Sequence, residues 1–163
     1  MAEYKHIEHE FSPVFDENSK ILILGSLPSV KSREQGFYYG HPQNRFWKVI
    51  AGICNCPVPD TIESKTEMLK HYHIAIWDVI ASCDIIGSSD SSIKNVIAND
   101  INLILAQCDI QKIYVNGKTA GKLYNKYSKE STGKEMIELP STSPANAAYS
   151  LERLTKAWSI VFE

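Results

Sequence analysis

Four short apolar segments, spread along the chain, constrain the fold more than any other feature. They are Lys20–Leu24 (KILIL), Ile74–Val79 (IAIWDV), Lys112–Val115 (KIYV) and Met136–Leu139 (MIEL). Continuous apolar runs of this length are typical of strands that are buried on both faces of a parallel sheet. Because parallel strands need a crossover between them, we expect helices in the intervening segments.

Helical patterns do separate the apolar segments. We expect helices over Gln43–Ile53, Ser64–Tyr72, Ile101–Gln107 and Lys118–Tyr127, and from Pro144 to about Phe162. Ser64 with Glu67 predicts a capping box, Asp100 predicts a cap for the third helix, and Pro144 suits a first helical turn. The alternation predicts an α/β fold, a three-layer α/β/α arrangement with a central parallel four-stranded sheet, formed by residues 1–163 as one domain.

Composition places the chain among ordinary globular proteins. It has 163 residues, of which 44% are hydrophobic and 22% charged. No apolar run approaches 18 residues, and Met1–Glu10 is polar with both charge signs, unlike a signal peptide. The net charge of −2 excludes coating of nucleic acid by bulk charge, although a local basic patch remains compatible with it. We therefore expect a cytoplasmic monomer without a membrane segment.

The cysteines and histidines predict neither a metal site nor a cofactor. The four cysteines are Cys54, Cys56, Cys83 and Cys108. Their spacing does not fit a zinc site, and reduced, partly buried thiols are favoured over an iron–sulfur cluster. His71 and His73 lack the pattern of a metal pair, and we expect them at the surface or at a helix end.

Glycines and polar residues follow the four strands, at the edge where a parallel sheet carries its ligand site. They are Gly25, Asp78, Asn116 and Ser141. In the segment Gly25–Ser29 (GSLPS), the glycine allows a ligand to approach the main chain and the proline stiffens the turn. An ordinary strand-to-loop turn is the alternative interpretation of this segment.

Two further segments carry weaker signals for anion binding. In Ser141–Asn146 (STSPAN), Ser143 as N-cap and Pro144 as first helical residue would leave free N–H groups for an anion, although an ordinary helix cap is favoured. Three lysines, Lys118, Lys122 and Lys126, recur on one helical face. They could follow phosphates, and a solvated helix face is the favoured interpretation.

The segment Gly36–Trp47 (GFYYGHPQNRFW) combines stacking surfaces with hydrogen-bonding side chains, as binding of a flipped nucleobase requires. Its tyrosines and Phe37 offer faces for stacking, whereas Phe46 and Trp47 fit the apolar stripe of the following helix. Asn44 offers a donor and an acceptor, His41 titrates near neutral pH, and Arg45 can reach a phosphate or a carboxylate.

The order of four motifs resembles the uracil-DNA glycosylase superfamily. They are GSLPS from Gly25, GHPQNRFWKVIAGI from Gly40, VNGK from Val115 and LPSTSPAN from Leu139. The HPQNRFWK block is similar to the mismatch-specific uracil/thymine glycosylases, and the whole set resembles the hypoxanthine-DNA (deoxyinosine) glycosylase branch. The resemblance spans Ile21 to Phe162. It implies a small domain with a parallel four-stranded sheet that hydrolyses the N-glycosidic bond of deaminated bases in DNA, without a cofactor.

One position departs from the superfamily. The third residue of the first motif is usually an Asp or Asn that positions the attacking water, and here it is Leu27. In the hypoxanthine branch the asparagine of the HPQNRFWK block is thought to take over, which implies a catalytic role for Asn44. The departure weakens the expectation of uracil removal more than that of base removal.

The resemblance assigns roles to individual residues. Asn44 and His41 are expected to be catalytic, Asn44 by orienting a water and His41 by protonating the base. The residues expected to bind the base are Gly25, Ser26, Leu27, Phe37, Tyr39, Asp78 and Asn116. Those expected to contact DNA are Pro28, Ser29, Ser141, Ser143, Pro144 and Asn146. Phe37 would stack on the base, and Asp78 would accept a hydrogen bond from hypoxanthine N1–H or serve as a helix cap.

Several functions remain open from the sequence. A monofunctional enzyme is expected because Lys31 and Lys48 flank the pocket residues of the motifs rather than stand where a Schiff base with the sugar would form. The alternatives are a uracil or mismatch-specific uracil/thymine glycosylase, a catalytically idle module that binds damaged DNA, and a hydrolase of free nucleosides.

Overall fold

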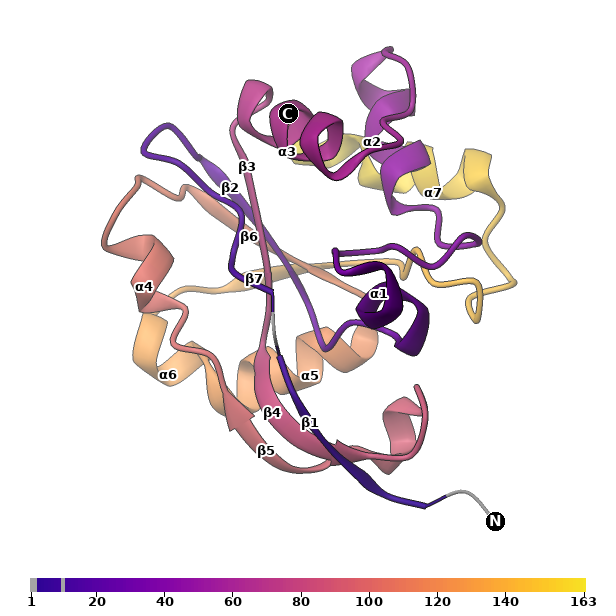
Figure 1. The fold of residues 1–163 in the computed structure, drawn as a ribbon. Helices are drawn as coiled ribbons and strands as arrows, with labels where there is room; N and C mark the ends of the chain where they lie inside the picture. The colour runs from indigo at the N-terminus through magenta and orange to yellow at the C-terminus, as the bar shows by residue number, and fades with distance from the viewer. Residues whose placement is uncertain (1–2, 10) are drawn as a thin grey trace.

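The central element is a parallel four-stranded sheet. A computed structural model describes residues 3–9 and 11–163. The strands are β2 (Ile21–Gly25), β3 (Ile74–Asp78), β6 (Lys112–Asn116) and β7 (Met136–Leu139), in the order β3-β2-β6-β7 and all parallel (Figure 1). The predicted sheet is confirmed. Its register pairs Gly25 with Asp78, so the ends of the two strands lie side by side.

Helices cover both faces of this sheet, which confirms the three-layer prediction. On one face lie α2 (Phe46–Cys54), α3 (Ile62–His71) and α7 (Leu151–Trp158) (Figure 1). On the other lie α4 (Asn102–Leu105), α5 (Lys118–Tyr127) and α6 (Lys129–Thr132). Phe46, Tyr114 and Trp158 are fully buried between the layers, as expected for an α/β core.

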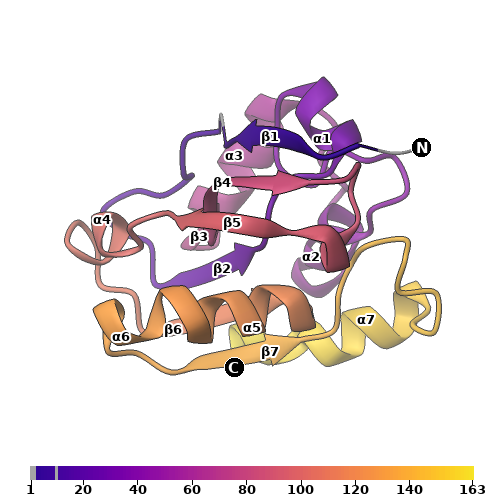
Figure 2. The ribbon, with the colours of Figure 1, turned by 90° about the horizontal axis from the view of Figure 1, so that it is seen from below.

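A second, antiparallel sheet was not predicted. It consists of β1 (Lys5–Glu8), β4 (Ile80–Ile85) and β5 (Lys94–Ala98), in the order β1-β4-β5 (Figure 2). Only Val79 separates β4 from β3, so one extended segment leaves the first sheet and enters the second. The outer strands are mostly exposed, and they therefore lack the apolar pattern on which strand prediction depends.

The remaining short elements are α1 (Val30–Gln35) and two 3₁₀ turns, η1 (Asp90–Ser92) and η2 (Ser159–Phe162). Sequence patterns missed α1. Its N-cap is Ser29, whose hydroxyl accepts a hydrogen bond from the Ser32 N–H.

Several predicted helix boundaries are wrong. α2 begins at Phe46 rather than Gln43, and α4 ends at Leu105 rather than Gln107. The capping box of α3 joins Thr61 and Ser64, one turn before the predicted pair. The start of α3 is set by the Thr61–Ser64 capping box, whereas the N-cap residues of α2 and α4 make no capping side-chain hydrogen bond. Intrinsic propensity does not mark such ends to the residue.

The last helix departs most from its prediction. α7 begins at Leu151 with Ser150 as N-cap, so residues 140–150 are irregular chain and Pro144 opens no helix. Side-chain contacts to this loop, described below, hold it in place of helical hydrogen bonds.

The cysteines, two histidines and three lysines named in the sequence can be placed in the structure. All four cysteines are free, and His71 and His73 are exposed. Lys122 and Lys126 are exposed, which supports the solvated-face interpretation, whereas the exposed Lys118 also borders the pocket described below. In the described ranges, no His, Cys, Asp and Glu side chains gather as a group that could hold a metal ion. None of the helices described is long and apolar enough to cross a lipid bilayer.

Candidate active site

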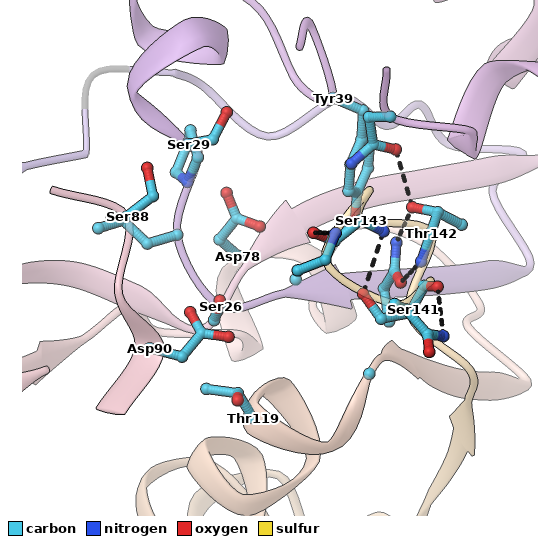
Figure 3. Close-up of a pocket in the computed structure, with 18 of the residues that line it drawn as sticks. Ser26, Ser29, Tyr39, Asp78, Ser88, Asp90, Thr119, Ser141, Thr142 and Ser143 are labelled. Atoms are coloured by element: carbon cyan, nitrogen blue, oxygen red, sulfur yellow. Dashed lines mark hydrogen bonds between the residues drawn. The ribbon is translucent and has the colours of Figure 1, made fainter. Parts of the chain in front are cut away.

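A pocket opens at the carboxyl ends of the parallel strands. Its volume is about 930 Å³. Its lining includes Gly25, Ser26, Leu27, Pro28, Ser29, Tyr39, Asn44, Asp78, Asn116, Ser141, Thr142, Ser143 and Asn146. Figure 3 shows Ser26, Ser29 and Asp78 on one side of the pocket and Tyr39 with the Ser141–Ser143 segment on the other. The topology therefore brings together most of the residues that the motifs singled out.

The floor of the pocket depends on the paired ends of β2 and β3. A Cβ atom added to Gly25 would lie 2.4 Å from Asp78 Oδ1 and 3.2 Å from the Tyr39 hydroxyl. Only a glycine leaves room for this carboxylate above the end of the neighbouring strand. No helix begins at Asp78, because the chain continues through Val79 into β4. The helix-cap alternative for Asp78 is therefore wrong.

Asp78 has a buried partner that sequence patterns missed. His9 Nε2 lies 2.7 Å from Asp78 Oδ2, and the side chains of His9 and Asp78 are only 2% and 5% exposed. His9 follows β1 and is anchored by its main-chain N–H, which donates to the Ala81 carbonyl. It lies 69 residues from Asp78 and stands in no recognisable motif, so only the unpredicted pairing of β1 with β4 brings it here.

Tyr39 presents a hydroxyl toward the same point. Its main chain has a φ of 53°, which is uncommon for a residue other than glycine, and its ring stacks on Phe46 at a centroid distance of 4.0 Å. The hydroxyl is buried and finds no hydrogen-bond partner among the described residues. Burial, and to a smaller extent the charge of Asp78, raise the pKa of Tyr39. The hydroxyl therefore stays protonated and can donate a hydrogen bond to a ligand.

A network of three side chains fixes the opposite wall. The Asn116 amide N–H₂ donates to Thr142 Oγ1 at 3.0 Å, and the Thr142 hydroxyl donates to Asn44 Oδ1 at 2.9 Å. Asn44 Oδ1 also accepts from the Phe46 N–H at 2.9 Å. With its oxygen engaged twice, Asn44 has its N–H₂ group left for a ligand.

The Ser141–Asn146 loop owes its shape to Arg45. The guanidinium of Arg45 donates to the carbonyls of Ser143 at 2.9 Å and Asn146 at 3.1 Å, and also to the Tyr149 carbonyl. The expectation that Arg45 reaches a phosphate or carboxylate is wrong in this structure. The predicted anion site at a helix start is also wrong, because the Ser143 hydroxyl accepts from the Ala145 N–H in a local turn.

The first motif, Gly25–Ser29, runs from the end of β2 to the N-cap of α1. Leu27 lines the pocket and packs against the cluster of Ile80, Cys83 and Ile85 from the second sheet. The buried Pro28 uses its carbonyl to accept from Arg33, and the hydroxyl of Ser29 is engaged in the cap of α1. The position where most of the superfamily carries a carboxylate or an amide is therefore part of an apolar contact.

Three expected site residues lie outside the described lining of the pocket. Phe37 stacks on Trp47 with 6.1 Å between ring centroids, and Pro144 lies half-buried in the loop. His41 Nδ1 accepts from the main-chain N–H of Gln43. Tyr39, with Tyr38 and Tyr149, supplies the aromatic side chains of the pocket lining, and Phe37 does not.

Comparison with known proteins agrees with this geometry. The model of the family described as the uracil DNA glycosylase superfamily matches residues 12–161. A curated relative from Methanosarcina acetivorans, named hypoxanthine DNA glycosylase, is 37% identical over 158 residues, which are 96% of this chain and 98% of the relative. A relative of the same name from Methanosarcina barkeri is 34% identical over 155 residues, 94% of this chain and 96% of the relative.

A solved structure of the same superfamily has a similar fold. The solution structure of a putative uracil DNA glycosylase from Methanosarcina acetivorans superposes with a TM-score of 0.80 at 37% identity, over 93% of this chain and 94% of that one. Fold, motif order and family match agree over nearly the whole length. The chain belongs to the uracil DNA glycosylase superfamily.

Proposed function

We propose that this protein is a monofunctional DNA glycosylase that removes hypoxanthine from deoxyinosine in DNA, with uracil as a second substrate. Two curated relatives that align over nearly their whole length are named hypoxanthine DNA glycosylase. The observation that carries the proposal in this chain is the juxtaposition of Asp78 Oδ1 and the Tyr39 hydroxyl above Gly25. Together they offer an acceptor next to a donor.

This pair matches the N–H beside a carbonyl that deamination creates and that guanine and thymine also present. Deamination turns the amino group of adenine or cytosine into a carbonyl and places a proton on the neighbouring ring nitrogen. Hypoxanthine therefore offers N1–H beside O6, and uracil offers N3–H beside O4. Asp78 would accept the ring N–H, and Tyr39 would donate to the carbonyl. Adenine presents the reverse pattern at these two atoms and would leave both groups unpaired.

The other residues of the pocket support a base swung out of the duplex. One face of the Tyr39 ring is covered by Phe46, and we propose that this contact holds the ring with its hydroxyl toward the edge of the flipped base. Asn116 and the main chain at Ser26 lie at the same strand ends. Ser29, Ser141, Ser143 and Asn146 line the pocket and are proposed to contact the DNA strand around the flipped nucleotide.

Hydrolysis then breaks the bond between C1′ and N9. The electron pair leaves on the base, a water oxygen bonds to C1′, and the proton from that water is lost to solvent or to the departing base. Asn44 cannot act as a strong base, and its engaged oxygen leaves its N–H₂ group to hold the water or the base. We propose that Asn44 contributes by position and electrostatics. His41 lies outside the pocket lining, so the proton donor is not assigned to it.

Domain number, oligomeric state and cellular location are proposed separately from the activity. We propose that the chain acts as one domain and as a monomer in the cytoplasm. Light scattering of the protein alone and on a short duplex tests the stoichiometry, and cell fractionation tests the location.

Three labelled duplexes test the proposed activity. They carry hypoxanthine, uracil or an undamaged base at one position, and alkali is added after incubation to break abasic sites. We expect breaks at hypoxanthine first and uracil second, and only after alkali, since a monofunctional enzyme leaves the strand intact. Breaks without alkali would overturn the monofunctional assignment. Binding without breaks on any duplex would favour the idle module, and activity on free deoxyinosine alone would favour a nucleoside hydrolase.

A further inference from the structure

We propose that His9 is a positioning residue for base recognition: it holds the Asp78 carboxylate in the orientation that reads the ring N–H of a deaminated base. The inference rests on the glycosylase activity proposed above and adds a residue from outside the family motifs. It starts from the two oxygens of Asp78, which have different surroundings. Oδ2 is bound to His9 Nε2 at 2.7 Å, whereas Oδ1 lies over Gly25 in the pocket floor.

The contact between His9 and Asp78 is shielded from water. Both side chains are at least 95% buried, so their hydrogen bond is not weakened by competing solvent. In the described part of the chain, His9 is the one side chain that hydrogen-bonds the Asp78 carboxylate. With Oδ2 occupied by the imidazole N–H, Oδ1 is the oxygen that remains to accept from a ligand.

His9 is itself firmly placed. Its main-chain N–H donates to the Ala81 carbonyl at 2.7 Å, which ties the end of β1 to β4. Its ring packs edge-on against Phe11 with 5.6 Å between centroids and lies 5.8 Å from the Tyr38 ring. The Tyr38 hydroxyl in turn donates to the Ser12 carbonyl at 2.9 Å. A rigid partner of this kind selects one orientation of the carboxylate.

The second histidine–aspartate pair of the chain supplies a contrast. His6 Nδ1 lies 2.9 Å from Asp84 Oδ1, so the two pairs share their chemistry. However, His6 is 57% exposed and Asp84 is 27% exposed, and neither lines the pocket. Loss of His6 therefore removes a comparable hydrogen bond without touching base recognition.

Two amide substitutions at His9 separate positioning from packing. In His9→Gln the terminal amide can place an N–H donor where Nε2 lies, whereas in His9→Asn the amide is one methylene shorter and ends near the position of Nδ1. Each variant, with His6→Asn as control, is assayed for the single-turnover rate of hypoxanthine release and for the Kd of the deoxyinosine duplex. Melting temperatures are recorded alongside.

We expect His9→Asn to slow release by about 100-fold, as a misplaced recognition group does, with a change in Kd of less than about threefold. His9→Gln should recover most of the rate, and His6→Asn should match the wild type. Equal rates for the Asn and Gln variants, whether both normal or both impaired, would overturn the positioning role. Adding His9→Asn to Asp78→Ala should cost nothing more, and a further loss there would also overturn it. A wild-type protein that releases no hypoxanthine would instead overturn the proposed function itself.

Discussion

The hydrogen atom that Gly25 carries in place of a side chain decides whether the Asp78 carboxylate can occupy the pocket floor. In Gly25→Ala the new methyl group would lie 2.4 Å from Asp78 Oδ1, closer than nonbonded atoms approach. The carboxylate must move, and we expect the rate of hypoxanthine release to fall by about 100-fold or more. Overpacking should also lower the free energy of unfolding by about 1–3 kcal/mol. Single-turnover kinetics and urea denaturation measure the two effects.

Gly52→Ala is the matched control for this substitution. Gly52 lies within α2, and an added Cβ would make an ordinary 3.4 Å contact with Thr155. Alanine is favoured over glycine inside a helix by about 0.5–1 kcal/mol, so this variant should be active and at least as stable as wild type. An active Gly25→Ala protein would show that Asp78 does not read the base.

Asn44 carries the second prediction at this scale. Asn44→Ala removes the N–H₂ group from the pocket and the acceptor of the Phe46 N–H. We expect the single-turnover rate to fall by about 100- to 1000-fold, as for loss of an electrostatic donor at a reacting centre, and stability to fall by about 1 kcal/mol. The exposed neighbour Gln43 provides the control Gln43→Ala, which should keep wild-type rates. A fully active Asn44→Ala enzyme would remove Asn44 from catalysis.

The residues of the pocket were predictable to different degrees. Asn44, Tyr39 and Asp78 stand out because they lie in motifs that follow strand ends or precede a helix, where the topology gathers ligand-binding residues. Phe37 could not be told from Tyr39 by sequence, since its stacking on Trp47 depends on how the turn is folded. The proposed role of His9 could not be predicted from the sequence, because it depends on a contact with Asp78, 69 residues away.

Among the elements, the loop that spans residues 140–150 is held by several side chains, of which Arg45 makes the most contacts to loop carbonyls. Arg45 binds three of its carbonyls, and its planar fork suits several acceptors at once. Arg45→Ala and Arg45→Lys should both lower the free energy of unfolding, by about 2–3 kcal/mol for the loss of charge-assisted hydrogen bonds. Both should weaken binding of the deoxyinosine duplex, because the loop lines the pocket.

The Arg45→Lys variant distinguishes the loop-holding role of Arg45 from the contact to a phosphate that the sequence suggested. A residue that contacts phosphate would be replaced by lysine with little loss, since charge is retained. Wild-type stability in Arg45→Lys, measured by urea denaturation, would therefore contradict the loop-holding role. Fluorescence anisotropy with the labelled duplex measures the accompanying change in Kd.

The elements themselves were predicted well where hydrophobic periodicity is strong. The four strands of the parallel sheet and α5 were predicted to within a residue or two. For β2, β3 and β6 burial leaves an apolar run, whereas the edge strand β7 is partly exposed. β1 and β5 are short and largely exposed, and Asn95 within β5 has a positive φ. The prediction starts α7 too early because Ser143–Pro144 has the form of a helix start. Tertiary contacts from Arg45 to this segment outweigh that local preference.

On the scale of the whole molecule, both sheets contribute residues to the pocket or to the side chains that line it. The parallel sheet supplies Gly25, Asp78 and Asn116 from its carboxyl ends, as its topology dictates. The antiparallel sheet brings His9 to Asp78 and covers Leu27. Leu27 is thus accommodated by an apolar wall, and our proposal places base recognition at the end of β3 and catalysis at Asn44, just before α2.

The measurement that tests this account most directly is release of the free base from a duplex with a single deoxyinosine opposite thymine. Mass spectrometry of the small-molecule fraction identifies the product, and a duplex with adenine at the same position is the control. The account predicts one hypoxanthine per duplex, an abasic site in an unbroken strand, and no adenine from the control. Binding of the deoxyinosine duplex with no release of hypoxanthine would contradict it and leave a module that only holds damaged DNA.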